Sequence, residues 1–278
     1  MMETPGIQRI RKTVGVPDTD LDLLDAALVI AASEYPAINV DSYHQRLDEW
    51  ASELRARIET DASAEDRLRA LNAFLFQELG FSGNTDDYYD PRNSYLNEVL
   101  DRKLGVPITL SMIYMALGQR IGLPLEGVSF PGHFLVKLPV DGGAVVLDPF
   151  NGGISLDEHD LCDLLERMFD TEVSEVAPLL TTASKTDILI RMLRNLKGIH
   201  QQGDEYDKAL RVVNMIIAID PHLEEEYRDR GLLLLQLECR HAALKDLRHY
   251  LSADPEAEDA ESIRDLIVEL GRSDTPLH

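Results

Sequence analysis

The sequence lacks the long apolar run that a membrane-spanning helix needs, because no segment approaches about 18 uninterrupted apolar residues. Its opening stretch, MMETPGIQRIRKTVGV, has no apolar core either, so we expect no signal peptide. Cysteine is scarce: Cys162 and Cys239 are too few for a disulfide framework and favour two free thiols in a reducing compartment. These absences predict a cytoplasmic protein without a membrane anchor.

Positive charge is also in short supply. The chain has 50 acidic and 27 basic residues among 278, with a formal net charge of -23. Such a surface repels nucleic-acid phosphates and anionic lipid, so we expect neither as a partner. It favours a very soluble protein, and it leaves open a basic partner or a salt-rich habitat. The length allows one large domain or two ordinary ones.

Helical spacing of apolar residues dominates the first half of the chain, after an irregular arm over residues 1–18. The helix over 108–121 is apolar on most sides, which is typical of a buried central helix. Pro107 fits its first turn, and Gly122 ends it. The other helices are expected over residues 21–31, with Asp20 as N-cap, and over 43–58, 65–79 and 94–102.

Three short β-prone segments follow, each bounded by Gly or Pro: Leu125–Phe130, Phe134–Leu138 and Ala144–Leu147. The four residues from Pro139 to Gly142 form a turn signal between the second and third segments. The pattern therefore predicts a small antiparallel sheet that contains a hairpin.

The register of that hairpin decides which side chains face one another. If Leu138 pairs with Gly143, then His133 lies opposite Asp148, and an imidazole can reach a carboxylate across the pair. The same register places a set of apolar residues together on the other face: Phe134, Val136, Leu138, Val145 and Leu147.

A histidine held by an aspartate is the orienting half of a nucleophilic triad, although many such pairs are only structural. A metal site is a further alternative, through His133 and Asp148 or through residues 157–160, DEHD. That acidic cluster is more typical of a helix start. We predict no metal and no cofactor.

The C-terminal third repeats itself with a period of 34 residues. Ala209-Leu210 returns as Ala243-Leu244, and Pro221 returns as Pro255. This period is that of the tetratricopeptide repeat. Lys197 stands where the first unit should have a small residue, whereas Gly231 fits that position in the second. We expect two helix pairs with close contacts at Gly231 and Ala243, capped by a helix over 261–270.

The whole pattern resembles a known family, the bacterial SirB-type proteins, which are described as transglutaminase-like with tetratricopeptide repeats. The resemblance spans residues 20–270 and rests on five segments: NSYLNEVLDRKLGVPITLSMIY (93–114), FPGHFLVKL (130–138), LDPFNGG (147–153), LIRMLRNLK (189–197) and RDRGLLL (228–234). It implies an α+β, mostly helical fold. A papain- or transglutaminase-like core with a small antiparallel sheet precedes all-α repeats. The expected divisions are an arm (1–20), a transglutaminase-like domain (21–180) and a repeat domain (186–272).

The resemblance also implies what is missing. In active enzymes of that superfamily a cysteine opens the central helix, about 15 residues before the glycine of a GIP-type turn, and the helix N-terminus helps make it a thiolate. Here that turn is Gly122-Leu123-Pro124, and counting back 15 from Gly122 gives Pro107. His133 and Asp148 match the other two triad positions. The nucleophile is therefore absent from its expected place.

These observations favour a non-catalytic interaction or regulatory protein that binds protein partners through the repeats and a cleft, with oligomeric state open. Cleft candidates are Asn93, Tyr95 and Phe130. The alternative is a hydrolase or amidase in which Ser111, one helical turn after Pro107, serves as nucleophile for His133 and Asp148. Otherwise Ser111 is a small polar residue bonded to a carbonyl of the preceding turn.

Overall fold

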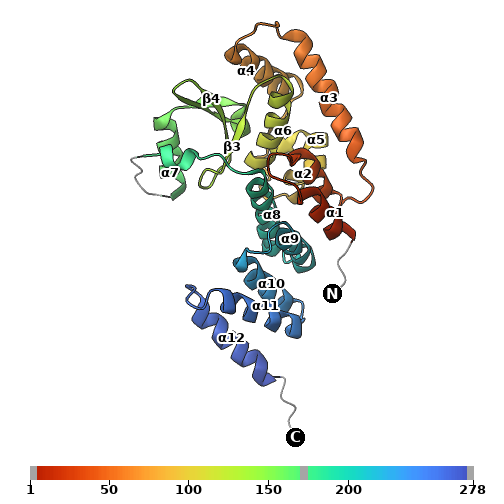
Figure 1. Ribbon diagram of the computed structural model, residues 1–278, viewed down its shortest axis with the longest axis vertical. Helices are drawn as coiled ribbons and strands as arrows, with labels where there is room; N and C mark the ends of the chain where they lie inside the picture. Colours follow the sequence, from red (N-terminus) through yellow and green to blue (C-terminus); the bar gives the residue numbers. More distant parts are fainter. Residues whose placement is uncertain (1–4, 170–174, 274–278) are drawn as a thin grey trace. The chain divides into compact units, whose positions relative to one another are not determined.

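The computed structural model describes residues 5–169 and 175–273 and is predominantly helical, with small sheets (Figure 1). The chain divides into two compact units. The core unit comprises residues 12–192, and the repeat unit comprises residues 193–278 together with 1–11. Each is described by itself. The expected α+β, mostly helical fold class is confirmed.

The core unit is built around α6 (Pro107–Arg120), as its apolar sequence predicts. Pro107 lies in the first turn, where its missing N–H removes no helical hydrogen bond. After the helix ends, Gly122 turns the chain with a φ of 82°. The helices packed on α6 are α2 (Leu23–Ala31), α3 (Val40–Arg57), α4 (Ala64–Asn72) and α5 (Leu96–Arg102).

The N-terminal segment differs from the prediction in two places. Residues 5–14 form helix α1 (Pro5–Val14) with Ile10 buried, although an irregular arm was expected. Residues 1–4 lie outside the described residues. Asp22 caps α2 in place of the predicted Asp20, because its carboxylate accepts hydrogen bonds from the backbone N–H groups of Leu24 and Asp25. The predicted third helix begins as α4 but continues as a π-helical turn, η1 (Ala73–Glu78).

The sheet of the core unit has four antiparallel strands in sequence order: β3 (Glu126–Val128), β4 (Leu135–Val140), β5 (Gly143–Asp148) and β6 (Ile154–Leu156). The first three match the predicted strands, and β6 was not predicted. A parallel pair, β1 (Ser82–Gly83) with β2 (Leu104–Gly105), was also missed, because two residues carry no detectable alternation.

The predicted hairpin register is wrong by two residues. Val140 pairs with Gly143, so the turn has two residues, and Gly142 adopts a φ of 87° there. Val136 consequently lies opposite Leu147. Since side chains alternate with a period of two, a shift of two residues leaves every side chain on its predicted face.

One side of the sheet packs against α7 (Glu158–Phe169), which follows β6 directly. The two elements share a cluster of buried apolar side chains: Val128, Phe130, Leu135, Val146, Leu161, Leu165 and Val176. This cluster anchors the segment that leads into His133, because Phe130 is fully buried in it.

The repeat unit contains the expected helix pairs. Its helices are α8 (Lys185–Gln202), of which residues from 193 belong to this unit, α9 (Tyr206–Ile219), α10 (Glu224–Gln236), α11 (Arg240–Ala253) and α12 (Ala260–Ser273). A Cβ at Gly231 would lie 2.8 Å from Leu247 side-chain atoms and 3.4 Å from the Ala243 carbonyl oxygen. The predicted close contact at Gly231 and Ala243 is thus confirmed. As expected, α12 caps the array by packing on Leu247 and Tyr250.

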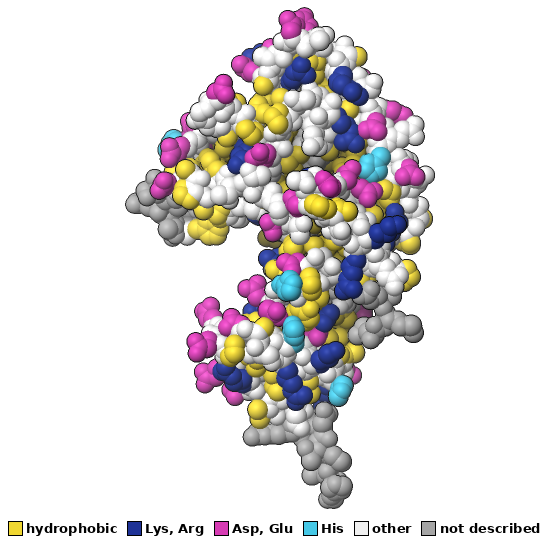
Figure 2. Space-filling view, in the orientation of Figure 1, with side chains coloured by type: hydrophobic (Ala, Val, Ile, Leu, Met, Phe, Trp, Pro, Cys, Tyr) yellow, Lys and Arg dark blue, Asp and Glu magenta, His cyan; other side chains and the backbone are white. Residues whose placement is uncertain are grey.

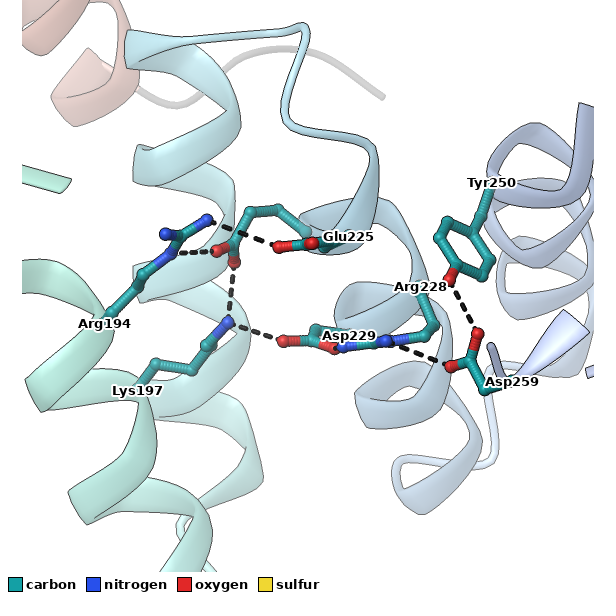
Figure 3. Close-up of polar contacts among 8 residues, drawn as sticks. Arg194, Lys197, Glu225, Arg228, Asp229, Tyr250 and Asp259 are labelled. Carbon is teal, nitrogen blue, oxygen red and sulfur yellow. Dashed lines mark hydrogen bonds and ion pairs between the residues drawn. The ribbon is translucent and has the colours of Figure 1, made fainter. Parts of the chain in front are cut away.

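Lys197, the residue that departs from the repeat pattern, has a specific role in this unit (Figure 3). Its ammonium lies 2.7 Å from a Glu226 carboxylate oxygen and 2.6 Å from one of Asp229. The other Glu226 oxygen accepts a hydrogen bond from Arg194 Nε at 2.7 Å. The network continues through Arg228, which bridges Asp229 and Asp259. Lys197 therefore joins α8 to α10 by charge, where a small residue would join them by close packing.

Within the described ranges, none of the helices has both the length and the apolar character that crossing a bilayer requires.

Candidate functional site

His133 and Asp148 form a buried, hydrogen-bonded pair in the core unit. The His133 Nε2 atom lies 3.0 Å from Asp148 Oδ2, and both side chains are less than one-tenth exposed. Asp148 also accepts hydrogen bonds from the Asn151 side-chain amide and from the backbone N–H groups of Phe150 and Asn151. The predicted contact is confirmed.

Burial alone would raise the pKa of Asp148. The hydrogen bond and charge of His133, with the bonds from Asn151 and Phe150, outweigh burial and hold that pKa below its ordinary value. Asp148 is therefore the ionised acceptor of the pair. Its carboxylate accepts the hydrogen bond from His133 Nε2 and leaves Nδ1 as the ring atom available to another group.

The local sequence explains how His133 reaches Asp148 despite the shifted register. His133 precedes β4 in a turn in which its N–H donates to the Phe130 carbonyl, and Gly132 has a φ of 67°. A Cβ at Gly132 would also lie 2.6 Å from Met168 Sδ, so glycine is required by both conformation and space. Asp148 ends β5 and caps the short 3-10 turn that follows.

Arg191, on α8, holds the turn that carries His133. Its Nη2 donates hydrogen bonds to the carbonyl oxygens of His133, at 2.6 Å, and Phe130, at 3.0 Å, and its guanidinium lies over the Phe134 ring. Burial lowers the pKa of Arg191. Among the described residues, no carboxylate lies within ion-pair distance of it. It contributes an uncompensated positive charge to the site.

Aromatic rings connect the pair to the loop over residues 81–95. Phe150 contacts the His133 ring edge-on, with centroids 6.0 Å apart, and Tyr88 contacts Phe150 in the same way at 6.1 Å. The tyrosine backbone is fixed because the Asn93 side-chain amide donates to the carbonyls of Asp87 and Tyr88. Phe150 therefore connects this loop to the His133 ring.

The three predicted cleft residues are all buried. The Asn93 side-chain amide donates a hydrogen bond to the Asp87 carbonyl of the loop. Tyr95 packs edge-on against Tyr35, and Phe130 belongs to the apolar cluster between the sheet and α7. Their contacts position the segments around His133. A direct binding role for them stays a prediction.

The position expected for the nucleophile holds a buried proline. Pro107 begins α6, and the backbone N–H of Val106, just before it, donates a hydrogen bond to the Thr109 hydroxyl oxygen. Ser111, the alternative nucleophile, is fully buried, and its hydroxyl has no hydrogen-bond partner among the described residues. It is therefore bonded neither to the His133 ring nor to the carbonyl of the preceding helical turn.

The setting of Cys162 disfavours a thiolate, and Cys239 lies in the other unit. Cys162 is half-buried against the apolar cluster on α7, and burial together with nearby Glu158 and Glu166 raises the pKa of its thiol. Cys239 is exposed at the N-cap of α11, in the repeat unit.

The acidic cluster over residues 157–160 caps a helix. The backbone N–H of Asp160 donates to the Asp157 carboxylate, and the N–H of Asp157 donates to Asp160 in return. No group of three or more histidine, cysteine, aspartate or glutamate side chains that could hold a metal occurs within residues 5–169 and 175–273.

Known proteins share both parts of this architecture. The family model of the transglutaminase-like superfamily matches residues 41–194, and that of the tetratricopeptide repeat matches residues 196–268. A UPF0162 protein of Xylella fastidiosa is 42% identical over 266 residues, which cover 95% of each chain. The protein SirB1 of Salmonella typhimurium is 30% identical over 240 residues, covering 84% of this chain and 87% of SirB1. The chain belongs to the transglutaminase-like superfamily, in the SirB1 and UPF0162 group. The division at residues 20, 180 and 186 stays a prediction.

Sequence reasoning missed several residues that complete the site in this SirB-type protein. Arg191, Tyr88, Phe150 and Asn151 surround His133 and Asp148, yet none was singled out. Arg191 and Phe150 do lie in the LIRMLRNLK and LDPFNGG segments that carry the family resemblance, which was the available signal.

Proposed function

We propose that this SirB-type protein is a non-catalytic interaction or regulatory protein, in which a degenerate triad serves binding rather than acyl transfer. The observation that carries the proposal is the pair of His133 and Asp148 without a thiol: Pro107 opens α6, where the resemblance implies the nucleophile. A proline offers no group that can attack a carbonyl. The cytoplasmic location expected from the sequence stays a prediction.

The groups around His133 suit recognition of a partner. Among the described residues, Nδ1 of His133 has no hydrogen-bond partner, and Arg191 retains donors without an acceptor. Large exposed apolar side chains lie near these polar groups: Tyr88 contacts both Phe150 and Tyr89, and Met168 and Phe169 lie beside Gly132. Exposed apolar groups beside oriented polar ones are typical of protein-binding surfaces.

An enzyme with Ser111 as nucleophile is the competing proposal. Its support is the Ser111 hydroxyl, which is buried one helical turn after Pro107 and lacks a hydrogen-bond partner among the described residues. Full burial weakens this proposal, because a substrate carbonyl must reach the hydroxyl. The two proposals differ in whether His133 supports turnover.

The test compares the natural protein with His133→Ala and Ser111→Ala variants on activated esters, on activated amides and in amine incorporation into glutamine side chains. We expect no turnover above the level of His133→Ala in any assay. Turnover that depends on both His133 and Ser111 would establish the enzyme instead.

Binding is tested separately by a photo-crosslinking amino acid placed at Tyr89, which is 64% exposed, in the full-length protein inside cells. Val16, also exposed in the core unit, is the control position. We expect a discrete protein adduct at position 89 that is lost in the Arg191→Ala background and absent at position 16. Equal adducts at both positions would contradict a binding surface near His133.

A further inference from the structure

The exposed side of α11 gathers positive charge in an otherwise acidic chain. Four basic side chains line one hollow there: Arg240, His241, Lys245 and Arg248. Figure 2 shows Lys and Arg side chains grouped over α11 and α12 of the repeat unit. The spacing of 241, 245 and 248 places these residues on one face of the helix. We call this set the α11 basic surface.

The opposite side of α11 packs against the neighbouring helices of the repeat unit. Ala243 and Leu247 are buried against α10, and Tyr250 is buried against α12. The α11 basic surface therefore takes no part in stacking the repeats. Packing gives no reason for its charge.

Nor does internal ion pairing explain the charge. In the described part of the chain, no carboxylate lies within ion-pair distance of Arg240, Lys245 or Arg248. Asp246 is the only acidic residue of α11, and it is buried and paired with Arg230 of α10. Glu238 lines the hollow without forming an ion pair with these cations.

Neighbouring arginines behave differently. Arg228 and Arg230 on α10 both pair with carboxylates. On α11, by contrast, three cations without a carboxylate among the described residues lie along one helix and line one hollow: Arg240, Lys245 and Arg248. Their charge is available to a group from outside the chain.

We propose that the α11 basic surface binds a short acidic segment of a partner protein. From Arg240 to Arg248 the helix rises about 12 Å, which an extended segment of about four residues spans. Carboxylates at that spacing complement the three cations. The proposal rests on the proposed interaction function and deepens it by giving the chemistry of the partner.

A nucleic acid fits this surface less well. Proteins that bind nucleic acid present a basic face along many phosphates. Here the basic surface is confined to a few residues on a chain of net charge -23, so a longer polyanion would meet repulsion beyond it.

The test measures binding of a fluorescein-labelled oligoglutamate peptide to the full-length protein by fluorescence anisotropy. The variant Arg240→Gln/Lys245→Gln/Arg248→Gln should bind about tenfold more weakly or worse. The control Lys12→Gln/Arg55→Gln/Arg167→Gln removes the same charge from exposed sites on the core unit and should bind as the natural protein does.

Equal affinity of the α11 variant and the natural protein would overturn the proposal. So would tighter binding of an oligothymidylate of equal charge, which would identify the partner class as nucleic acid. The thermal midpoint of the variant is measured alongside, and the single change Arg248→Gln provides a milder version if the triple variant is unstable. Turnover that depends on His133 would contradict the proposed non-catalytic function, but it would not change the affinity of the α11 basic surface for the peptide. Failure of one proposal is therefore distinguishable from failure of the other.

Discussion

Replacing Lys197 by alanine is expected to destabilise the repeat unit, although alanine restores the small residue that the repeat pattern favours. The reason is Glu226, whose side chain is 1% exposed and accepts charge-assisted hydrogen bonds from Lys197 and Arg194. Without the ammonium, a buried carboxylate keeps only Arg194, which is 41% exposed.

The expected loss in the free energy of unfolding depends on how far Arg194 still compensates the charge of Glu226. Removing one partner of a buried ion pair costs about 3–5 kcal/mol. Because Arg194 still compensates Glu226 in part, we expect a loss of about 3 kcal/mol, at the lower end of that range. Adding Glu226→Gln to Lys197→Ala should recover at least half of the loss, since no uncompensated charge then remains buried.

The assay is urea unfolding of the full-length protein followed by far-UV circular dichroism. Trp50 is the only tryptophan and lies in the core unit, so its fluorescence follows that unit separately. Lys208→Ala, which breaks an ion pair with Glu205 whose side chains are 35% and 41% exposed, is the control and should cost less than about 1 kcal/mol. A Lys197→Ala protein as stable as the natural one would refute the reasoning.

Three further outcomes are expected. Gly231→Leu should destabilise the repeat unit by about 1–3 kcal/mol through overpacking against Leu247, and an unchanged melting temperature would count against the close contact. Because the pKa of Asp148 is lowered in the folded protein, its ionised form stabilises the fold above the ordinary value of 3.8, and this contribution is lost as the pH falls below it. The stability difference between the natural protein and Asp148→Asn, measured by urea unfolding, should therefore shrink at acidic pH, and a constant difference would argue against an ionised Asp148. Alkylation of Cys162 and Cys239 should leave partner crosslinking at position 89 unchanged. Loss of the crosslinked adduct after alkylation would show that a thiol contributes to partner binding.

Periodicity predicted those elements whose burial is regular. The central helix, the first three strands of the sheet and the repeat helices all have an apolar face that repeats at a fixed interval. The pair of His133 and Asp148 was also predictable, because it depends on which face each residue occupies. The wrong register did not disturb it, since a shift of two residues preserves the face.

The remaining features depend on contacts between distant segments. Arg191 holds the His133 turn through backbone carbonyls, which leave no residue pattern in the sequence. The π-helical turn after Asn72 and the charged replacement at Lys197 also depend on residues far away in the chain. For Lys197 the departure from the repeat pattern was visible, but its partner Glu226 lies 29 residues further on.

The central claim is that Pro107 occupies the place of a lost nucleophile beside His133, and the most direct measurement is the reactivity of a thiol at that place. In Pro107→Cys, the alkylation rate as a function of pH should give an apparent thiol pKa below about 8.5, because the N-terminus of α6 and His133 both favour the thiolate. Adding His133→Ala should raise that pKa. An apparent pKa at or above about 8.5, unaffected by His133→Ala, would mean that position 107 does not face His133 and would contradict the degenerate triad.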